Sequence, residues 1–514
     1  MSGISLRLAL LGLGLVLAQP ATAKERKPKL KPVPVVDQSA AAANAASAAA
    51  MRHLDAIARL DDAAGGPQLN AVIVFNPTAP AEAARLSATG RLKGRTVLVK
   101  DNVETKEWAT TAGSLALKDN KTGRDAPLVA RIRADGGVVL GKTNLSEWAN
   151  IRSPASSSGW SGVGGQTKNP HATDRNPCGS SSGSGAAIAA GMAWAAVGTE
   201  TDGSITCPAS ANGIVGFKPT VGLVSRTFVV PISHSQDTAG PMAASVFGAA
   251  LLLTAMVGSD PADPATLEAD KYKTDYTAGL GLSSLKGVRI GVLSKQSGKH
   301  PGVNRVFDRA LMDLSAAGAV LVPIAYDFPG ELGRDEGVVL YFELREDLDA
   351  YLAALPGTPP VRSLADVIMF NKDHANEELR WFGQETFIKA ESPVDRAIYQ
   401  KARANSLRLA GSEGIDKLLA DNKVVVLIAP TEGPAWPIDL VNGDHYIGIG
   451  AGSLAAVAGY PHLTVPMGDV EGLPVGLSLI GPKWGDKLVL DLGAAYERAR
   501  TVQLKAPSFK RWGE

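Results

Sequence analysis

The chain has 514 residues, of which 45% are hydrophobic and 20% are charged. This length and composition predict one very large globular domain or a few ordinary ones. The 52 basic and 51 acidic residues leave a formal net charge of +1, so nothing in the charge calls for nucleic acid or an anionic membrane as a partner.

The N-terminus, residues 1–23, has the pattern of a signal peptide. Arg7 gives a weak positive start, Leu8–Ala18 form an apolar run, and Ala-Thr-Ala at positions 21–23 is a cleavage signal. The apolar run is too short to cross a bilayer comfortably, so a retained anchor is the weaker alternative. We expect cleavage after Ala23 and export to a periplasm or out of the cell, with no membrane association of the mature chain.

The following residues alternate between strand-like and helix-like patterns. Residues 24–38 are rich in Lys and Pro and are expected to be extended, and the alanine-rich residues 39–50 begin a helix that continues through Asp61. Strands are expected at Leu69–Phe75, Thr96–Lys100, Gly137–Leu140, Gly213–Pro219, Gly222–Ser225, Val288–Leu293, Val320–Pro323, Val424–Ala429 and Leu473–Ile480. Helices are expected at Leu128–Asp135, Met242–Val257, Val303–Ala317, Leu340–Leu352, Phe370–Phe387 and Leu488–Ala499.

This alternation predicts an α/β fold in a single large domain over residues 39–514. Its sheet is expected to carry helices on both faces. Within this domain, residues 327–393 are expected to form a helical insertion that serves as one wall of a cleft.

The most unusual stretch is residues 178–208, CGSSSGSGAAIAAGMAWAAVGTETDGSITCP. Glycine costs backbone entropy in ordered structure and serine favours turns and caps, so this stretch predicts two tight turns on either side of a small-residue helix. Such turns direct hydroxyls and backbone N–H groups into a small space. Cys178 and Cys207 are expected to be buried thiols, with a disulfide as the alternative that export would permit.

Several familiar catalytic arrangements do not fit this chain. Gly179–Gly183 matches G-x-S-x-G around Ser181, but that motif needs a preceding strand, which Arg175–Cys178 do not form. The seven histidines lie in no motif of a catalytic triad or a zinc site, and no Cys/His cluster exists. We therefore expect no metal and no cofactor.

Lysine remains as a candidate base. Lys100 ends the apolar strand Thr96–Lys100. The simpler interpretation is a lysine at the protein surface. Burial at the strand end would instead favour its neutral form. A neutral lysine with paired serines is an alternative to the Ser-His-Asp arrangement.

At these positions the chain resembles the amidase signature family. Gly179–Pro208 matches the family's Gly/Ser-rich signature and Val99–Asn102 its strand-end lysine motif. Other family-like segments are Thr111–Ser114, Gly141–Asn144, Gln166–Pro170, Gly216–Thr220, Asp237–Pro241 and Gly472–Gly476. The resemblance spans roughly residues 50–500. It is greatest to the bacterial peptide-amidase branch, through Ser156–Trp160, Pro177–Gly185 and Glu200–Ser204.

The resemblance implies the amidase signature fold, with a mixed central β-sheet, and a Ser–Ser–Lys triad. In that triad Ser204 is the nucleophile, Ser180 is the bridging serine after a cis bond from Gly179, and Lys100 is the base. The backbone N–H groups of the turn formed by Thr201, Asp202, Gly203 and Ser204 are implied to bind the oxyanion. Ser181, Ser182 and Ser184 are expected to be cap or turn residues.

The implied activity is hydrolysis of C-terminal peptide amides through an acyl-enzyme on Ser204, with release of ammonia. The expected partners are a small-molecule or peptide amide and water, and the expected state is a monomer or homodimer. The alternatives are an amidase or esterase for other substrates, such as aryl amides or cyclic lactams, and a catalytically inactive periplasmic binding protein. Among departures from the family pattern, Thr206 stands where many members have Arg, and no departure removes a catalytic group.

Overall fold

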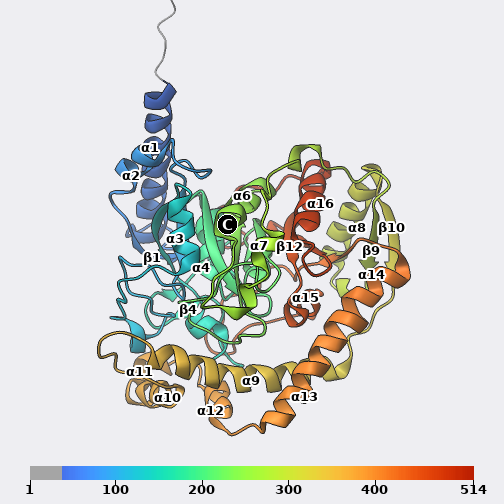
Figure 1. Cartoon of the computed structure of the whole chain (residues 1–514). Helices are drawn as coiled ribbons and strands as arrows, with labels where there is room; N and C mark the ends of the chain where they lie inside the picture. Colours follow the sequence, from blue (N-terminus) through green and yellow to red (C-terminus); the bar gives the residue numbers. More distant parts are fainter. Residues whose placement is uncertain (1–37) are drawn as a thin grey trace, which may run out of the picture. The chain divides into compact units, whose positions relative to one another are not determined.

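An 11-stranded mixed sheet lies at the centre of residues 39–514, which form one compact unit (Figure 1). The computed structural model describes residues 38–514, so the expected signal peptide and the extended segment before residue 38 lie outside the described residues. In sheet order the strands are β1 (Val72–Phe75), β3 (Val138–Thr143), β2 (Thr96–Lys100), β6 (Ala195–Glu200), β8 (Thr238–Ala243), β7 (Val215–Lys218), β12 (His462–Val470), β13 (Leu473–Ile480), β11 (Val426–Pro430), β9 (Arg289–Leu293) and β10 (Val320–Ile324). β2 runs parallel to β3 and β6, and β9 runs parallel to β10 and β11, whereas the other neighbouring strands are antiparallel.

Helices cover both faces of this sheet, which confirms the predicted fold class. In β2, Val97 and Val99 pack into one core and Leu98 packs into another, because successive side chains of a strand point to opposite faces. The helices are α1 (Gln38–Ile57), α2 (Ala79–Leu86), α3 (Pro127–Ala134), α4 (Ser182–Ala189), α5 (Thr206–Ala211), α6 (Val246–Met256), α7 (Ala269–Tyr272), α8 (Pro301–Ala316), α9 (Gly330–Ala353), α10 (Leu364–Asp373), α11 (Ala375–Glu378), α12 (Glu385–Glu391), α13 (Arg396–Leu407), α14 (Asp416–Asn422), α15 (Gly452–Ala458) and α16 (Asp486–Ala499). Of these, α3, α6, α8 and α16 pack on one face, and α4 and α5 on the other.

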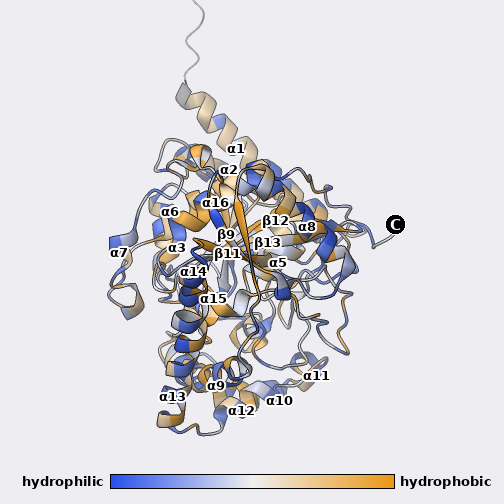
Figure 2. Ribbon diagram, turned by 90° about the vertical axis from the view of Figure 1, so that its right-hand side faces the viewer, coloured by the Kyte–Doolittle hydropathy of each residue, from blue (hydrophilic) through white to orange (hydrophobic). Residues whose placement is uncertain are grey.

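Hydropathy follows this layering. Figure 2 shows hydrophobic residues on the strands and more hydrophilic residues on outer helices such as α14, none of whose residues is buried. None of the helices within residues 38–514 combines the length and apolarity that crossing a membrane requires.

Helices α9–α13 form a layer of their own that packs largely on itself (Figure 1). Leu344, Leu348 and Leu352 of α9 share a core with residues of α10 and α12. On the same helix, Phe342 stacks on Tyr399 of α13, with ring centroids 4.0 Å apart. This layer contains the predicted insertion, whose role as a cleft wall stays a prediction.

The stretch 178–208 contains a strand that the sequence did not predict. After α4 the chain forms β6, which lies between β2 and β8. Alanine favours helices, so the segment resembled one continuous small-residue helix between two turns. Its burial inside the sheet outweighs that preference, because every residue of β6 is buried.

Other expectations about element boundaries were also wrong. Met242 belongs to β8, and α6 begins only after Ser245, whose side chain accepts a hydrogen bond from Gly248 N–H and so caps the helix. Residues 370–387 are divided among α10, α11 and α12 instead of forming one helix. Gly222–Ser225 lie in a turn instead of a strand. Strands β8 and β12 were not predicted.

Candidate active site

Lys100 ends strand β2 and is completely buried beside Ser180. Its Nζ atom lies 2.7 Å from Ser180 Oγ, 2.9 Å from Thr199 Oγ1 and 3.2 Å from the Thr199 carbonyl oxygen. Burial lowers the pKa of Lys100 to about 7, although the carboxylates of Asp237 and Glu200 act to raise it. A sizeable neutral fraction is therefore present near pH 7, and a neutral lysine can accept a proton. The alternative of a surface lysine is excluded.

The serine-rich turn places Ser180 against Lys100 and uses its other hydroxyls differently. The Gly179–Ser180 peptide bond is cis, as the resemblance implied. Ser181 stands at the start of α4 without capping it. The hydroxyls of the three other serines each donate a hydrogen bond to a backbone carbonyl: Ser181 to Thr199 (3.1 Å), Ser182 to Cys178 (2.6 Å) and Ser184 to Val197 (3.0 Å).

Ser204 lies in the turn that connects β6 to α5. Glu200, the last residue of β6, anchors this turn, because its carboxylate accepts hydrogen bonds from the N–H groups of Ile205 (2.7 Å) and Thr206 (2.9 Å). Gly203 has a φ of +82°, a conformation that favours glycine. Ser204 itself is 9% exposed.

Three backbone N–H groups of this turn have no acceptor within the described residues. Among the hydrogen bonds of residues 38–514, none uses the backbone N–H of Asp202, Gly203 or Ser204 as a donor. Free N–H groups beside a serine hydroxyl are what a developing oxyanion requires.

The two serine turns are joined in two ways. The N–H of Ser181 donates a hydrogen bond to the carbonyl of Ser204 (3.1 Å). Cys178 and Cys207, which flank the pair, form a disulfide with a Cα–Cα distance of 5.9 Å. The expectation of two free buried thiols was therefore wrong, because the fold brings the cysteines within bonding distance. The structure thus brings Lys100 and Ser180 into direct contact and joins the turn of Ser204 to the turn of Ser180 through the backbone. Among the hydrogen bonds of residues 38–514, none links Ser204 Oγ to Ser180 Oγ.

Residues 231–237 form a second support for the turn Thr201–Ser204, and no pattern in the sequence indicated this role. Asp237 accepts hydrogen bonds from Thr201 Oγ1 (2.5 Å) and from the N–H groups of Ile232 (2.8 Å) and Ser233 (2.9 Å). Burial raises the pKa of Asp237 to about 6. The only signal in the sequence was that Asp237 begins one of the family-like segments.

Two further carboxyl groups lie beside this turn. Burial raises the pKa of Asp202 well above its usual range, and the neighbouring Glu336 of α9 adds to that effect. Burial also raises the pKa of Glu336, which accepts a hydrogen bond from Gln236 Nε2 (2.9 Å). Gln236 Nε2 also lies 3.4 Å from the carbonyl of Thr201. Helix α9 therefore lies beside the turn Thr201–Ser204.

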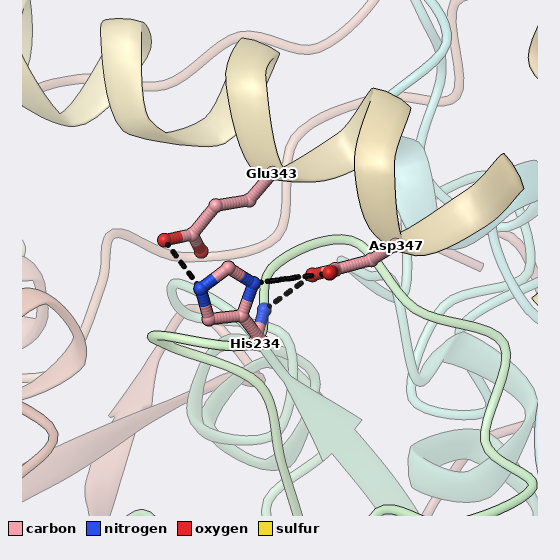
Figure 3. A group of neighbouring side chains, drawn as sticks. All are labelled: His234, Glu343 and Asp347. Atoms are coloured by element: carbon pink, nitrogen blue, oxygen red, sulfur yellow. Dashed lines mark hydrogen bonds and ion pairs between the residues drawn. The ribbon is translucent and has the colours of Figure 1, made fainter. Parts of the chain in front are cut away.

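One group of side chains has the spacing of a metal site. The potential ligand atoms of His234, Glu343 and Asp347 all lie within 4.8 Å of one another (Figure 3). His234 lies in the loop before β8 and both acids lie on α9, so no local motif could have revealed the group. It does not include Lys100, Ser180 or Ser204.

Comparison with known proteins identifies the family of this chain. The family model described as Amidase matches residues 55–490. The chain belongs to the amidase signature family. It is therefore an amidohydrolase that acts on amide C–N bonds, and its structure has the amidase signature fold.

Solved and curated relatives match 80% to 92% of this chain. The peptide amidase of Stenotrophomonas maltophilia is 46% identical, with a TM-score of 0.86 over 92% of this chain and 97% of its own. A peptide amidase in complex with the competitive inhibitor chymostatin is 47% identical, with a TM-score of 0.86 over 91% and 97%. A probable amidase of Arabidopsis thaliana is 37% identical over 89% of this chain and 87% of its own length. The A subunit of glutamyl-tRNA(Gln) amidotransferase from Halobacterium salinarum is 34% identical over 80% and 97%.

Proposed function

We propose that this chain is an exported serine amidase that hydrolyses the C-terminal carboxamide of peptides and releases ammonia. Ser204 is the nucleophile, Ser180 relays its proton and Lys100 is the base. The observation that carries the proposal is the contact of 2.7 Å between Lys100 Nζ and Ser180 Oγ, in a buried setting that lowers the pKa of Lys100 to about 7.

The first half of the reaction forms the acyl-enzyme. Neutral Lys100 takes the proton of Ser180 while Ser180 takes the proton of Ser204, whose Oγ attacks the amide carbonyl carbon. The oxyanion accepts hydrogen bonds from the N–H groups of the turn Thr201–Ser204, and each such donor contributes about 3 kcal/mol to the transition state. The proton returns through Ser180 to the amide nitrogen, so ammonia leaves and an ester on Ser204 remains.

The second half releases the peptide acid. Water gives a proton to Lys100 through Ser180 and attacks the ester carbonyl, and the same N–H groups bind the second oxyanion. Collapse of that intermediate returns the proton to Ser204. The products are one peptide carboxylic acid and one ammonia for each amide and water consumed.

The proposal of a peptide amide as the substrate rests on sequence identity to known enzymes. The identity to peptide amidase is 46% to 47%, compared with 34% to the amidotransferase subunit. The expected signal peptide, Met1–Ala23, also favours an extracytoplasmic substrate over one in protein synthesis. The intact set of Lys100, Ser180 and Ser204 disfavours an inactive binding protein.

One assay compares the candidate substrates. The mature chain, from residue 24 onward, is incubated with a peptide amide, free glutamine and an anilide, and ammonia or aniline is measured. The proposal expects the highest kcat/KM with the peptide amide. Preference for the anilide or for glutamine would replace the proposed substrate, and no turnover of any of them would favour a binding protein.

Export needs a separate test. Expression of the full chain in a bacterium, followed by cell fractionation and N-terminal sequencing, is expected to place a product that begins at Lys24 outside the cytoplasm. An intact N-terminus on the cytoplasmic protein would reject this part of the proposal.

A further inference from the structure

The side chain of His234 lies between two carboxylates of helix α9 (Figure 3). Its Nδ1 atom is 2.9 Å from Asp347 Oδ2, and its Nε2 atom is 3.3 Å from Glu343 Oε1. The backbone N–H of His234 also donates a hydrogen bond to Asp347 Oδ2 (2.7 Å). The hydrogen-bond partner of Nε2 is Tyr399 Oη (3.3 Å), whose own proton is donated to Glu343 Oε1 (2.7 Å). Because the Asp347 carboxylate only accepts and the Tyr399 oxygen has no second proton to give, His234 carries a proton on each ring nitrogen.

Glu343 is already supplied with donors from the protein. It is completely buried and accepts hydrogen bonds from Ser235 N–H (3.0 Å), from the hydroxyls of Ser233 and Ser235 and from Tyr399 Oη (2.7 Å). A metal ion at this place would have to displace protons and donors that the loop provides. The imidazolium of His234 fills the position of the cation instead.

The same loop, residues 231–237, also contacts the turn Thr201–Ser204. Asp237 accepts a hydrogen bond from the hydroxyl of Thr201, and Gln236 contacts both Thr201 and Glu336 of α9. Residues 231–237 therefore connect helix α9 to the turn that presents the backbone N–H groups beside Ser204.

We propose that His234 is a positioning residue for the oxyanion site. Its bridge between Glu343 and Asp347 fixes the loop 231–237 on α9, and Asp237 and Gln236 transmit that position to Thr201. Loss of the bridge moves the N–H groups of the turn and lowers kcat more than it changes KM, because those groups act most strongly in the transition state. The activity readout of this inference rests on the proposed function.

The proton on His234 makes this bridge dependent on pH. The hydrogen bond to Asp347 raises the pKa of His234 above its ordinary value of 6.5, Glu343 adds to the effect, and partial burial and Arg226 oppose it. The bridge is therefore complete below pH 6.5 and is lost as pH rises through the raised value. The other titratable groups around it are Tyr399 and Arg403 of α13, which act on Glu343, and Asp263, which pairs with Arg226.

The test compares two variants of neighbouring residues on α9. Asp347→Asn keeps an acceptor for the backbone N–H of His234 but removes the charge. Glu346→Gln is the matched control, since Glu346 pairs with Arg396 (2.6 Å) and not with the loop. The kcat for a peptide amide is measured from acid to alkaline pH in both variants and in the wild type.

The wild type is expected to lose kcat at alkaline pH, and Asp347→Asn is expected to shift that loss to lower pH by about one unit. Glu346→Gln is expected to leave the alkaline loss in place, and KM is expected to stay within about twofold throughout. An alkaline loss that is the same in Asp347→Asn and Glu346→Gln, or that is absent from the wild type, would overturn the inference.

Two further measurements separate this inference from its alternatives. In Ser204→Ala, the NMR shift of the Thr201 amide is expected to follow the titration of the His234 ring, so the coupling is visible even if peptide amides are not substrates. If the shift of the Thr201 amide did not follow the titration of His234, the inference would be rejected. Treatment with EDTA is expected to leave kcat unchanged, and activity that EDTA removes and Zn²⁺ restores would instead identify a metal site.

Discussion

The Nζ atom of Lys100 lies 2.7 Å from Oγ of Ser180, although these residues are 80 positions apart in the chain. The contact exists because β2 ends beside the turn that begins α4. It unites a group that can accept a proton with a hydroxyl that can relay one.

The acid side of the pH profile is expected to report Lys100. Because the base must be neutral and its pKa is lowered to about 7, kcat is expected to rise as pH increases through that value. Lys100→Ala is expected to lower kcat by at least about a thousandfold. Measurement of kcat from pH 5 to 9 checks both, and a rise centred far from pH 7 would point to another group.

Lys100 is also expected to lower the folding stability of the chain. Its pKa is lower in the folded chain than the ordinary 10.5, so between about pH 7 and 10.5 the unfolded chain binds more protons and folding stability rises with pH. Lys100→Met is expected to be more stable than the wild type at pH 7 and to lack this part of the slope. Urea unfolding at several pH values measures the effect, and equal slopes in the two proteins would contradict it.

Replacement of Ser204 and replacement of Ser180 are expected to have different effects on turnover. Ser204→Ala is expected to remove turnover and the transfer of the acyl group to hydroxylamine, because no acyl-enzyme forms. Ser180→Ala is expected to lower kcat by about 10²- to 10⁴-fold. Ser182→Ala is the control, since the hydrogen bonds of that hydroxyl go to the Cys178 carbonyl and to Ser146 Oγ and not to Lys100, Ser180 or Ser204. Hydroxamate formed by Ser204→Ala at the wild-type rate would reject Ser204 as the nucleophile.

Gly203 offers a test of the oxyanion turn. A Cβ at Gly203 would meet no atom within 4 Å, but its φ of +82° disfavours alanine, so Gly203→Ala is expected to cost about 1–2 kcal/mol of stability. Gly191→Ala is a matched control, with a φ of +69° and equally open space. Only Gly203→Ala is expected to lose kcat by tenfold or more. Equal kcat in the two variants would show that the turn does not act in catalysis.

The disulfide is expected to stabilise both turns. Replacement of Cys178 and Cys207 by serine is expected to lower the free energy of unfolding by about 2–4 kcal/mol. Urea unfolding with and without a reducing agent measures this, and the serine variant provides the control because it should not respond to the reductant. An unchanged midpoint on reduction of the wild type would contradict the prediction.

The sequence predicted the features that local patterns carry. Strand β2 has the predicted bounds, Thr96–Lys100, because a short apolar run flanked by turn residues is a strong local signal. Strand β6 was missed, since its alanines favour a helix when the sheet on either side of it is not known. The mixed sheet and the family followed from several motifs taken together.

Features that depend on contacts between distant parts of the chain were harder to predict from the sequence. The Cys178–Cys207 bond needs a Cα separation that only the fold sets. The bridge of His234 to Glu343 and Asp347 joins a loop to a helix more than 100 positions later in the chain, so neither segment carries a motif for it. The signal for Lys100 was stronger because its strand was recognisable by itself.

The parallel pairing of β2 with β6 has a consequence for refolding experiments. Leu98 lies opposite Ala196 and Val99 opposite Val197, and both strands end at residues of the site, Lys100 and Glu200. A slip by one position would exchange the faces on which Val99 and Lys100 lie while the chain stayed compact. Recovery of amide hydrolysis after denaturation is therefore a direct reporter of native strand register, which a measurement of compactness would not distinguish.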